Sequence, residues 1–180
     1  MFDNLKYPIL NEDSKESVLR NAYLYACHKD IEVIKPGNVN INSPHHDTTA
    51  SDYLISSINS GSELFHEEYS LGDRILKAVI ATRDETLTNT NLGIIMLCAP
   101  IIHALVKYKG SDLREAIIKT IDDATPDDTI KICKAINISS PGGLGDASEY
   151  DTKSLPNVKL REIMSYSAGY DRISYQYHNN

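Results

Sequence analysis

"TLTNTNLGIIMLCAPIIHALVKY", residues 86–108, holds the longest apolar run in this chain of 180 residues, and this run decides the fold. Its apolar part, Leu92 to Val106, is only fifteen residues long, which is too short for a comfortable membrane span. A buried core helix is therefore the better interpretation. Because the helix is apolar nearly all round, other elements have to pack against every side of it.

Helical patterns also occupy most of the sequence on both sides of this run. Asp13 and Glu16 form a possible capping box ahead of a helix over 17–34, which Pro36 and Gly37 end. Further helices are expected at 53–65 behind a Thr49–Asp52 capping box, at about 71–82, at 113–124 behind Ser111 or Asp112, at 129–138 behind Asp127 or Asp128, and at about 157–175. No alternating β pattern is longer than four residues. We therefore expect an all-α fold, a compact multi-helix bundle in a single domain over 1–180, with two longer polar loops at 36–50 and 138–156.

The composition is that of an ordinary soluble protein, with 24% charged and 41% hydrophobic residues. The net charge of −7 argues against nucleic acid and anionic membranes as partners, so any phosphate site has to be built locally. Cys27, Cys98 and Cys133 lie in apolar segments and are expected to be buried, reduced thiols. No secretory signal is visible at the N-terminus, and we expect a cytoplasmic protein.

The polar residues before the apolar run offer more caps than one helix needs. Asn89, Thr90 and Asn91 can each accept a hydrogen bond from the N–H groups of a first helical turn. Gly93 weakens the helix unless something must come close to the backbone. A helix N-terminus is also a natural site for an anion. Plain capping and ligand binding both remain open.

The stretch "PGGLGDASEYD", residues 141–151, joins a glycine loop to three carboxylates. Gly142, Gly143 and Gly145 permit positive φ and close backbone approach, as phosphate sites require, although a helix C-cap and turn would use them too. The spacing is not that of a P-loop, and no strand precedes the loop as in a dinucleotide-binding fingerprint. The three carboxylates that follow suit Mg²⁺ bound together with substrate phosphates, or the first turn of a helix: Asp146, Glu149 and Asp151.

"SPHHD", residues 43–47, is a third candidate segment. His46 or Asp47 could bind a metal or exchange a proton, and the alternative is a polar loop with an aspartate cap. The aspartate pairs at 122–123 and 127–128 are better explained as helix-end residues.

In their order and spacing these segments resemble the triphosphoribosyl-dephospho-coenzyme A synthase family, and are closer to its archaeal-type branch. The matching motifs are "KPGNVN" (35–40), "HHDTTASDYLISS" (45–57), "NTNLGI" (89–94), "PGGLGDASEYD" (141–151) and "AGYDRISYQY" (168–177). The resemblance runs from about residue 20 to the end of the chain.

The resemblance implies an all-α, ATP-binding transferase that moves the triphosphoribosyl group of ATP to a hydroxyl of dephospho-coenzyme A, or of a related alcohol, with release of adenine. It implies Mg²⁺ with ATP, bound by Asp146, Glu149 and Asp151, and Asp47 or His46 as the catalytic base. The nucleotide-binding positions that it implies are Lys35, Gly37, Asn38, Asn89, Thr90, Asn91, Gly93, Gly142, Gly143, Gly145 and Arg172.

Members of the family usually continue with further helices, so the chain resembles the N-terminal part of a longer family domain. A domain that ends here is expected to leave an apolar face open, and then to form a homodimer or to bind a separately encoded C-terminal partner. The final segment supplies an apolar stripe for such a face, made of Val158, Leu160, Ile163, Met164, Ala168 and Ile173.

Two other classes remain open. One is an all-α, metal-dependent nucleotide phosphohydrolase that uses the 45–47 segment with Asp122 or Asp123. The other is a non-catalytic nucleotide-binding or partner subunit.

Overall fold

The computed structural model describes residues 14–35, 39–44, 48–86, 88–142, 145 and 147–179. Within them the chain forms α1 (Lys15–Glu32), α2 (Ala50–Glu63), α3 (Leu71–Thr86), α4 (Leu92–Lys107), α5 (Leu113–Asp123), α6 (Pro126–Ser139), the short 3₁₀ helix η1 (Thr152–Ser154), α7 (Leu160–Ser167) and α8 (Arg172–Asn179). These residues contain no strand, only an isolated bridge between Asn40 and Ser43. The predicted all-α fold is confirmed.

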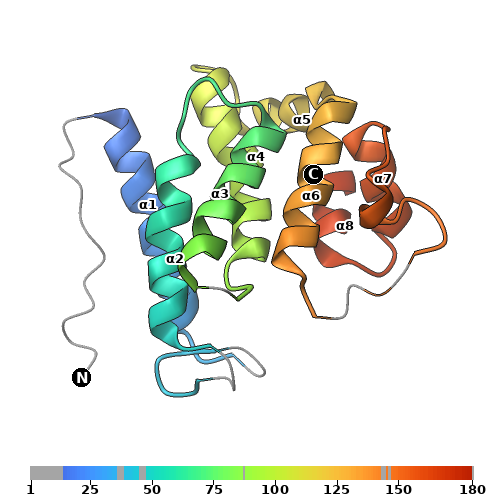
Figure 1. The fold of residues 1–180 in the computed structure, drawn as a ribbon. Helices are drawn as coiled ribbons and strands as arrows, with labels where there is room; N and C mark the ends of the chain where they lie inside the picture. The colour runs from blue at the N-terminus through green and yellow to red at the C-terminus, as the bar shows by residue number, and fades with distance from the viewer. Residues whose placement is uncertain are drawn as a thin grey trace.

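Helices α1 to α4 run alternately down and up and α6 runs down again, whereas α5 lies across the upper end of the view (Figure 1). In Figure 1, α1, α2, α3 and α6 stand side by side, α4 lies behind α3, and α7 and α8 lie beyond α6. The connection from α1 to α2, the turn from α3 to α4 and the segment after α6 all emerge at the lower end of the view. The described parts of three motif segments that are far apart in the sequence therefore lie at one end of the bundle.

Helix α4 is the central core helix that its composition predicts. Its inner face is fully buried at Ile95 and Ala99, and it packs in one hydrophobic cluster with Ile75 of α3, Ile132 of α6 and Leu160 of α7. Its outer face is open, because Leu97 is 42% exposed and Ile101 is 39% exposed, so the expected packing against every side of this helix is not found within the described chain. Among the described helices, none has the length and hydropathy needed to cross a membrane.

The N-terminal caps of α2, α1 and α6 can be compared with the helix starts expected from the sequence. The Thr49–Asp52 capping box of α2 is confirmed, with both reciprocal bonds present. The cap of α1 is Ser14, whose hydroxyl accepts from the Ser17 N–H, whereas Asp13 of the expected Asp13–Glu16 box lies outside the described residues. Helix α6 begins earlier than predicted, because Thr125 caps it in a box with Asp128, and Pro126 takes the first helical position, where its missing N–H costs nothing.

The single helix expected over 157–175 is two helices. Helix α7 ends at Ser167, and the Asp171 carboxylate then accepts from the Ser174 N–H, which starts α8 in a new direction. Helix α7 buries Leu160, Ile163 and Met164, which are all less than one-tenth exposed, and Val158, Ala168 and Ile173 of the same stripe are partly buried. The prediction that this stripe forms an open face is therefore wrong.

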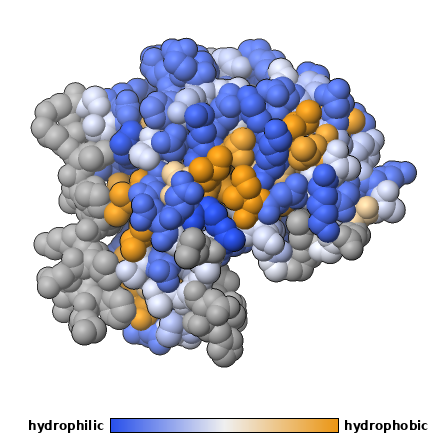
Figure 2. All heavy atoms as spheres, in the orientation of Figure 1, coloured by the Kyte–Doolittle hydropathy of each residue, from blue (hydrophilic) through white to orange (hydrophobic). Residues whose placement is uncertain are grey.

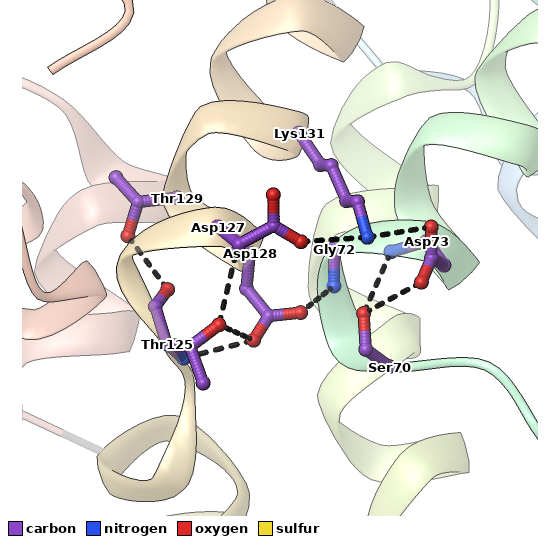
Figure 3. Close-up of polar contacts among 8 residues, drawn as sticks. All are labelled: Ser70, Gly72, Asp73, Thr125, Asp127, Asp128, Thr129 and Lys131. Atoms are coloured by element: carbon purple, nitrogen blue, oxygen red, sulfur yellow. Dashed lines mark hydrogen bonds and ion pairs between the residues drawn. The ribbon is translucent and has the colours of Figure 1, made fainter. Parts of the chain in front are cut away.

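A buried polar junction joins the starts of α3 and α6 (Figure 3). The Asp128 carboxylate accepts from the Gly72 N–H at 2.8 Å and from the Thr125 N–H and hydroxyl at 2.8 and 2.7 Å. Lys131 pairs with Asp73 at 2.9 Å and with Asp127 at 2.8 Å. These aspartates are helix-end residues, in agreement with the prediction for 127–128.

Candidate functional site

A cavity of about 430 Å³ lies between the start of α4, one face of α6, the segment 141–152, and helices α7 and α8. This volume is within the range of pockets that hold small ligands. Six residues proposed from the sequence line it: Asn89, Gly93, Gly142, Gly145, Glu149 and Asp151. The turn before α4 and the segment after α6, separated by about fifty positions in the sequence, therefore contribute to one site.

The wall of the cavity has an apolar and a polar part. Its buried portion is mostly apolar and includes Met96 of α4, Ile132 of α6 and Met164 of α7, with Thr129 and Ser174 as its buried hydroxyl residues. Its acidic members are Glu149, Asp151 and Asp171, and no described residue of the lining is a lysine or an arginine. The described wall therefore offers no cation to an anionic ligand, which would need backbone N–H groups, a metal ion or cations from elsewhere.

The turn before α4 divides its polar side chains between two directions. Asn89 lines the cavity, whereas the Thr90 hydroxyl shares a 2.5 Å hydrogen bond with Ser56 of α2. Asn91 occupies the N-cap position of α4, but its side chain accepts no bond from the first turn, and its amide donates instead to the Tyr53 carbonyl at 3.1 Å. The first N–H groups of α4, beside the cavity, thus have no side-chain cap.

The segment that follows the glycine loop is held by its own aspartate. The Asp151 carboxylate accepts from the N–H groups of Ala147 at 3.0 Å and Lys153 at 2.8 Å, and these two bonds lower the pKa of Asp151. Asn137 of α6 fixes the same segment, because its amide donates to the Thr152 carbonyl at 2.9 Å and accepts from the Thr152 hydroxyl at 2.7 Å. Asp151 therefore shapes the wall of the cavity.

The family model that describes ATP:dephospho-CoA triphosphoribosyl transferases matches residues 16–180 of this chain. The chain belongs to this family. The match covers all the elements that build the cavity, and it confirms the resemblance predicted from the motifs. Neither the comparison with curated proteins nor that with solved structures gave a match.

Four of the described positions expected for this transferase family do not line the cavity: Thr90 and Asn91, which bond to α2, and Lys35 and Arg172. Lys35 forms an ion pair with Asp30 at the end of α1. Arg172 lies over the ring of Tyr175, 4.9 Å from its centroid, although its neighbours Asp171 and Ile173 line the cavity. The remaining expected positions fall outside the described residues: Gly37, Asn38, His46, Asp47, Gly143 and Asp146.

The predicted magnesium site stays a prediction for the same reason. The described residues contain no group of three side chains able to hold a metal ion, and Asp146 is not among them. Of the other two carboxylates, Asp151 has both oxygens bonded to backbone N–H groups, while Glu149 is an exposed member of the cavity wall. Glu149 is therefore the better placed ligand of the two.

The thiol and carboxylates that other mechanisms would need are neutral or already paired. Cys133 lines the cavity, but burial raises the pKa of its thiol to about 11, so it is not a thiolate nucleophile at neutral pH. Asp122 pairs with Arg161 at 2.6 Å, and Asp123 pairs with Lys119 at 2.7 Å. These two ion pairs give no support to the phosphohydrolase alternative.

Sequence reasoning missed three members of the cavity wall. Tyr150 and Asp171 lie in the motifs 141–151 and 168–177, but the sequence assigns neither a role in the site, and Tyr166 lies outside both motifs. The rings of Tyr150 and Tyr166 meet edge to face at 5.4 Å, and both line the cavity. The one sequence signal was the position of Tyr150 between Glu149 and Asp151, directly behind the glycine loop.

Proposed function

We propose that this chain transfers the triphosphoribosyl group of ATP to a hydroxyl of dephospho-coenzyme A and releases adenine. The observation that carries the proposal is the cavity, in which the motif turn before α4 and the glycine loop after α6 meet in a chain that belongs to this family. Its apolar interior and acidic wall fit a substrate with a flat base and a cationic transition state.

The reaction exchanges one bond at C1′ of the ATP ribose. The bond from C1′ to the adenine nitrogen breaks, and a bond from C1′ to the hydroxyl oxygen of the acceptor forms. The acceptor hydroxyl gives its proton to a base, and the departing adenine takes up a proton. Positive charge develops on the ribose as the first bond lengthens, and a nearby carboxylate stabilises it. Glu149 and Asp171 are the described carboxylates that suit this role.

The triphosphate needs donors, because the described cavity wall carries three carboxylates and no cation. The uncapped first turn of α4 supplies backbone N–H groups and the positive end of a helix dipole beside Asn89 and Gly93. Mg²⁺, shared between the phosphates and Glu149, with Asp146 as a further candidate, would neutralise the remaining charge. We retain Asp47 or His46 as the proposed base that accepts the hydroxyl proton.

Incubation of the protein with ATP, Mg²⁺ and dephospho-coenzyme A, followed by liquid chromatography and mass spectrometry, tests the proposal. We expect free adenine together with an acceptor that has gained the triphosphoribosyl group, and neither product in EDTA. Release of phosphate in place of adenine would support the phosphohydrolase alternative. Binding of ATP without turnover, with each of several alcohol acceptors, would support the non-catalytic alternative.

A further inference from the structure

Tyr150 has a backbone conformation that a residue with a large side chain rarely adopts. Its φ is +52°, in the left-handed region that glycine and asparagine occupy most readily. Such a conformation persists only where the surrounding contacts enforce it, and these residues concentrate at ligand sites.

Contacts from two helices enforce this conformation. Asn137 of α6 holds Thr152 through two hydrogen bonds on one side of the segment. On the other side, the Tyr150 hydroxyl donates to the Glu162 carboxylate of α7 at 2.7 Å. The direction of the Tyr150 ring is therefore fixed from both ends, by its backbone and by its hydroxyl.

The ring that is fixed in this way forms part of an aromatic pair in the cavity wall. The planes of Tyr150 and Tyr166 lie at 73° with their centroids 5.4 Å apart, and both side chains line the cavity. Tyr150 is partly buried, whereas Tyr166 is 39% exposed, so ring surface of the pair remains uncovered. Most of the buried side chains of the same cavity are aliphatic or methionine, such as Met96 and Ile132, beside the buried Thr129, Cys133 and Ser174.

A cavity wall that combines two tyrosine rings with apolar side chains is suited to a ligand with a flat, weakly polar ring. Bases stack on tyrosine rings in nucleotide-binding proteins, and aliphatic and methionine side chains cover the remaining apolar surface of the base. Phosphates and ribose hydroxyls do not stack on aromatic rings. They would form hydrogen bonds with the polar groups at the starts of α4 and α8.

We propose that Tyr150 and Tyr166 form the wall on which the adenine ring of an adenine nucleotide stacks, and that they set the preference of the site for a purine. This inference rests on the proposed function. ATP and dephospho-coenzyme A both carry adenine, and the test separates these two sources.

Calorimetric titration of the wild type and of Tyr166→Leu with ATP, dephospho-coenzyme A and inorganic tripolyphosphate tests this assignment. Tyr166→Leu removes the ring from an exposed position, and we expect it to weaken one adenine nucleotide roughly tenfold. The nucleotide that loses affinity is the one whose base stacks here. Tripolyphosphate, which has no base, should bind both proteins equally, and Tyr166→Phe should retain the wild-type affinity for nucleotides.

Tyr150→Gly provides a second variant should Tyr166→Leu fail to fold. Glycine adopts the left-handed conformation without strain, which offsets part of the loss of the Glu162 bond and the ring contact, so we expect this variant to fold with a modestly lower melting temperature and to lose nucleotide affinity. Unchanged affinity of both variants for both nucleotides would overturn the assignment, as would an equal loss of affinity for tripolyphosphate. A wild type that binds neither nucleotide overturns the proposed function and this inference together, whereas the other two outcomes leave the proposed function standing.

Discussion

Two asparagines in the turn before α4 show how neighbouring side chains of one kind take different roles. Asn91 is 1% exposed and ties the start of α4 to α2 through the Tyr53 carbonyl, whereas Asn89 lines the cavity. The sequence presents both as equivalent caps. Which one faces the cavity depends on the position of α2, which lies about thirty residues earlier in the chain.

Substitution by aspartate separates the two roles. Asn91→Asp removes the donor to Tyr53 and places a charge in a buried site, so we expect a loss of about 2–4 kcal/mol in the free energy of unfolding. Asn89→Asp should leave that free energy nearly unchanged and weaken ATP binding about tenfold, because it adds negative charge beside the phosphates. Thermal melting and calorimetry measure both effects. Wild-type ATP affinity in Asn89→Asp would remove Asn89 from the site.

Gly72 lies where there is no space for a side chain, and no pattern in the sequence predicts this. A Cβ atom there would lie 2.6 Å from the Cα atom of Asp128, so α3 and α6 would have to separate. We expect Gly72→Ala to cost about 1–3 kcal/mol, as overpacking of a tight contact does. Gly93→Ala is the matched control, because its Cβ would meet only Ile173 at 3.7 Å and alanine favours a helix. Equal melting temperatures for the two variants would contradict this packing.

At the scale of helices, the junction of α3 and α6 makes stability depend on pH. Burial raises the pKa of Asp128, but hydrogen bonds from the groups around it, including Ser70, Thr125 and Gly72, outweigh burial and lower it. A carboxyl whose pKa is lower in the folded protein stabilises the fold above its unfolded pKa of about 4. That contribution disappears as pH falls from about 4 through the folded value.

Comparison with Asp128→Asn isolates this contribution. At pH 7 we expect the variant to be less stable by about 1–3 kcal/mol, because an amide cannot accept from both Gly72 and Thr125. The difference should shrink as the pH falls below about 4. Urea unfolding of both proteins over a pH series measures it. A difference that stays constant down to the acid limit would show that the charge of Asp128 has no part in the junction.

The sequence predicts a helix well where a helical spacing of apolar residues begins directly after a capping residue, as at α2 and α5. The prediction of helix boundaries fails where two residues could each cap the helix, or where the boundary depends on contacts with distant parts of the chain. Both Thr125 and Asp127 are good caps, and only the box with Asp128 decides between them. The break between α7 and α8 interrupts a stripe that is continuous in sequence. The same is true of the site. The segments that line it can be identified from the sequence, but the contact of Tyr150 with Tyr166 depends on how two segments pack together.

At the scale of the molecule, apolar side chains remain on the surface. Figure 2 shows hydrophobic side chains over α2, α3 and α6 on one face. The exposed hydrophobic residues of α2 and α3 include Ile55, Ile58 and Ile80. Helix α4 adds Leu97 and Ile101, one turn apart on its outer face. The expected homodimer remains a prediction, and the open face of α4 is the surface we assign to it.

Charge substitution tests that surface. We expect a dimer in size-exclusion chromatography with light scattering, and a monomer with an unchanged melting temperature for Leu97→Lys, because a buried lysine disrupts an apolar interface. Ile80→Lys is the control, since Ile80 is 39% exposed on another helix and should leave the dimer intact. A wild type that is monomeric at micromolar concentration would refute the dimer.

Measurement of adenine release by the wild type and by two variants of Gly93 is the most direct test of whether this cavity is the site of triphosphoribosyl transfer. With ATP, Mg²⁺ and dephospho-coenzyme A, we expect the wild type and Gly93→Ala to release adenine at similar rates. Gly93→Leu, whose side chain extends toward Ile173 into the cavity, should melt like the wild type and lose roughly a hundredfold in rate. Wild-type rates in Gly93→Leu, or no adenine from the wild type, would contradict the assignment of this cavity as the site of triphosphoribosyl transfer.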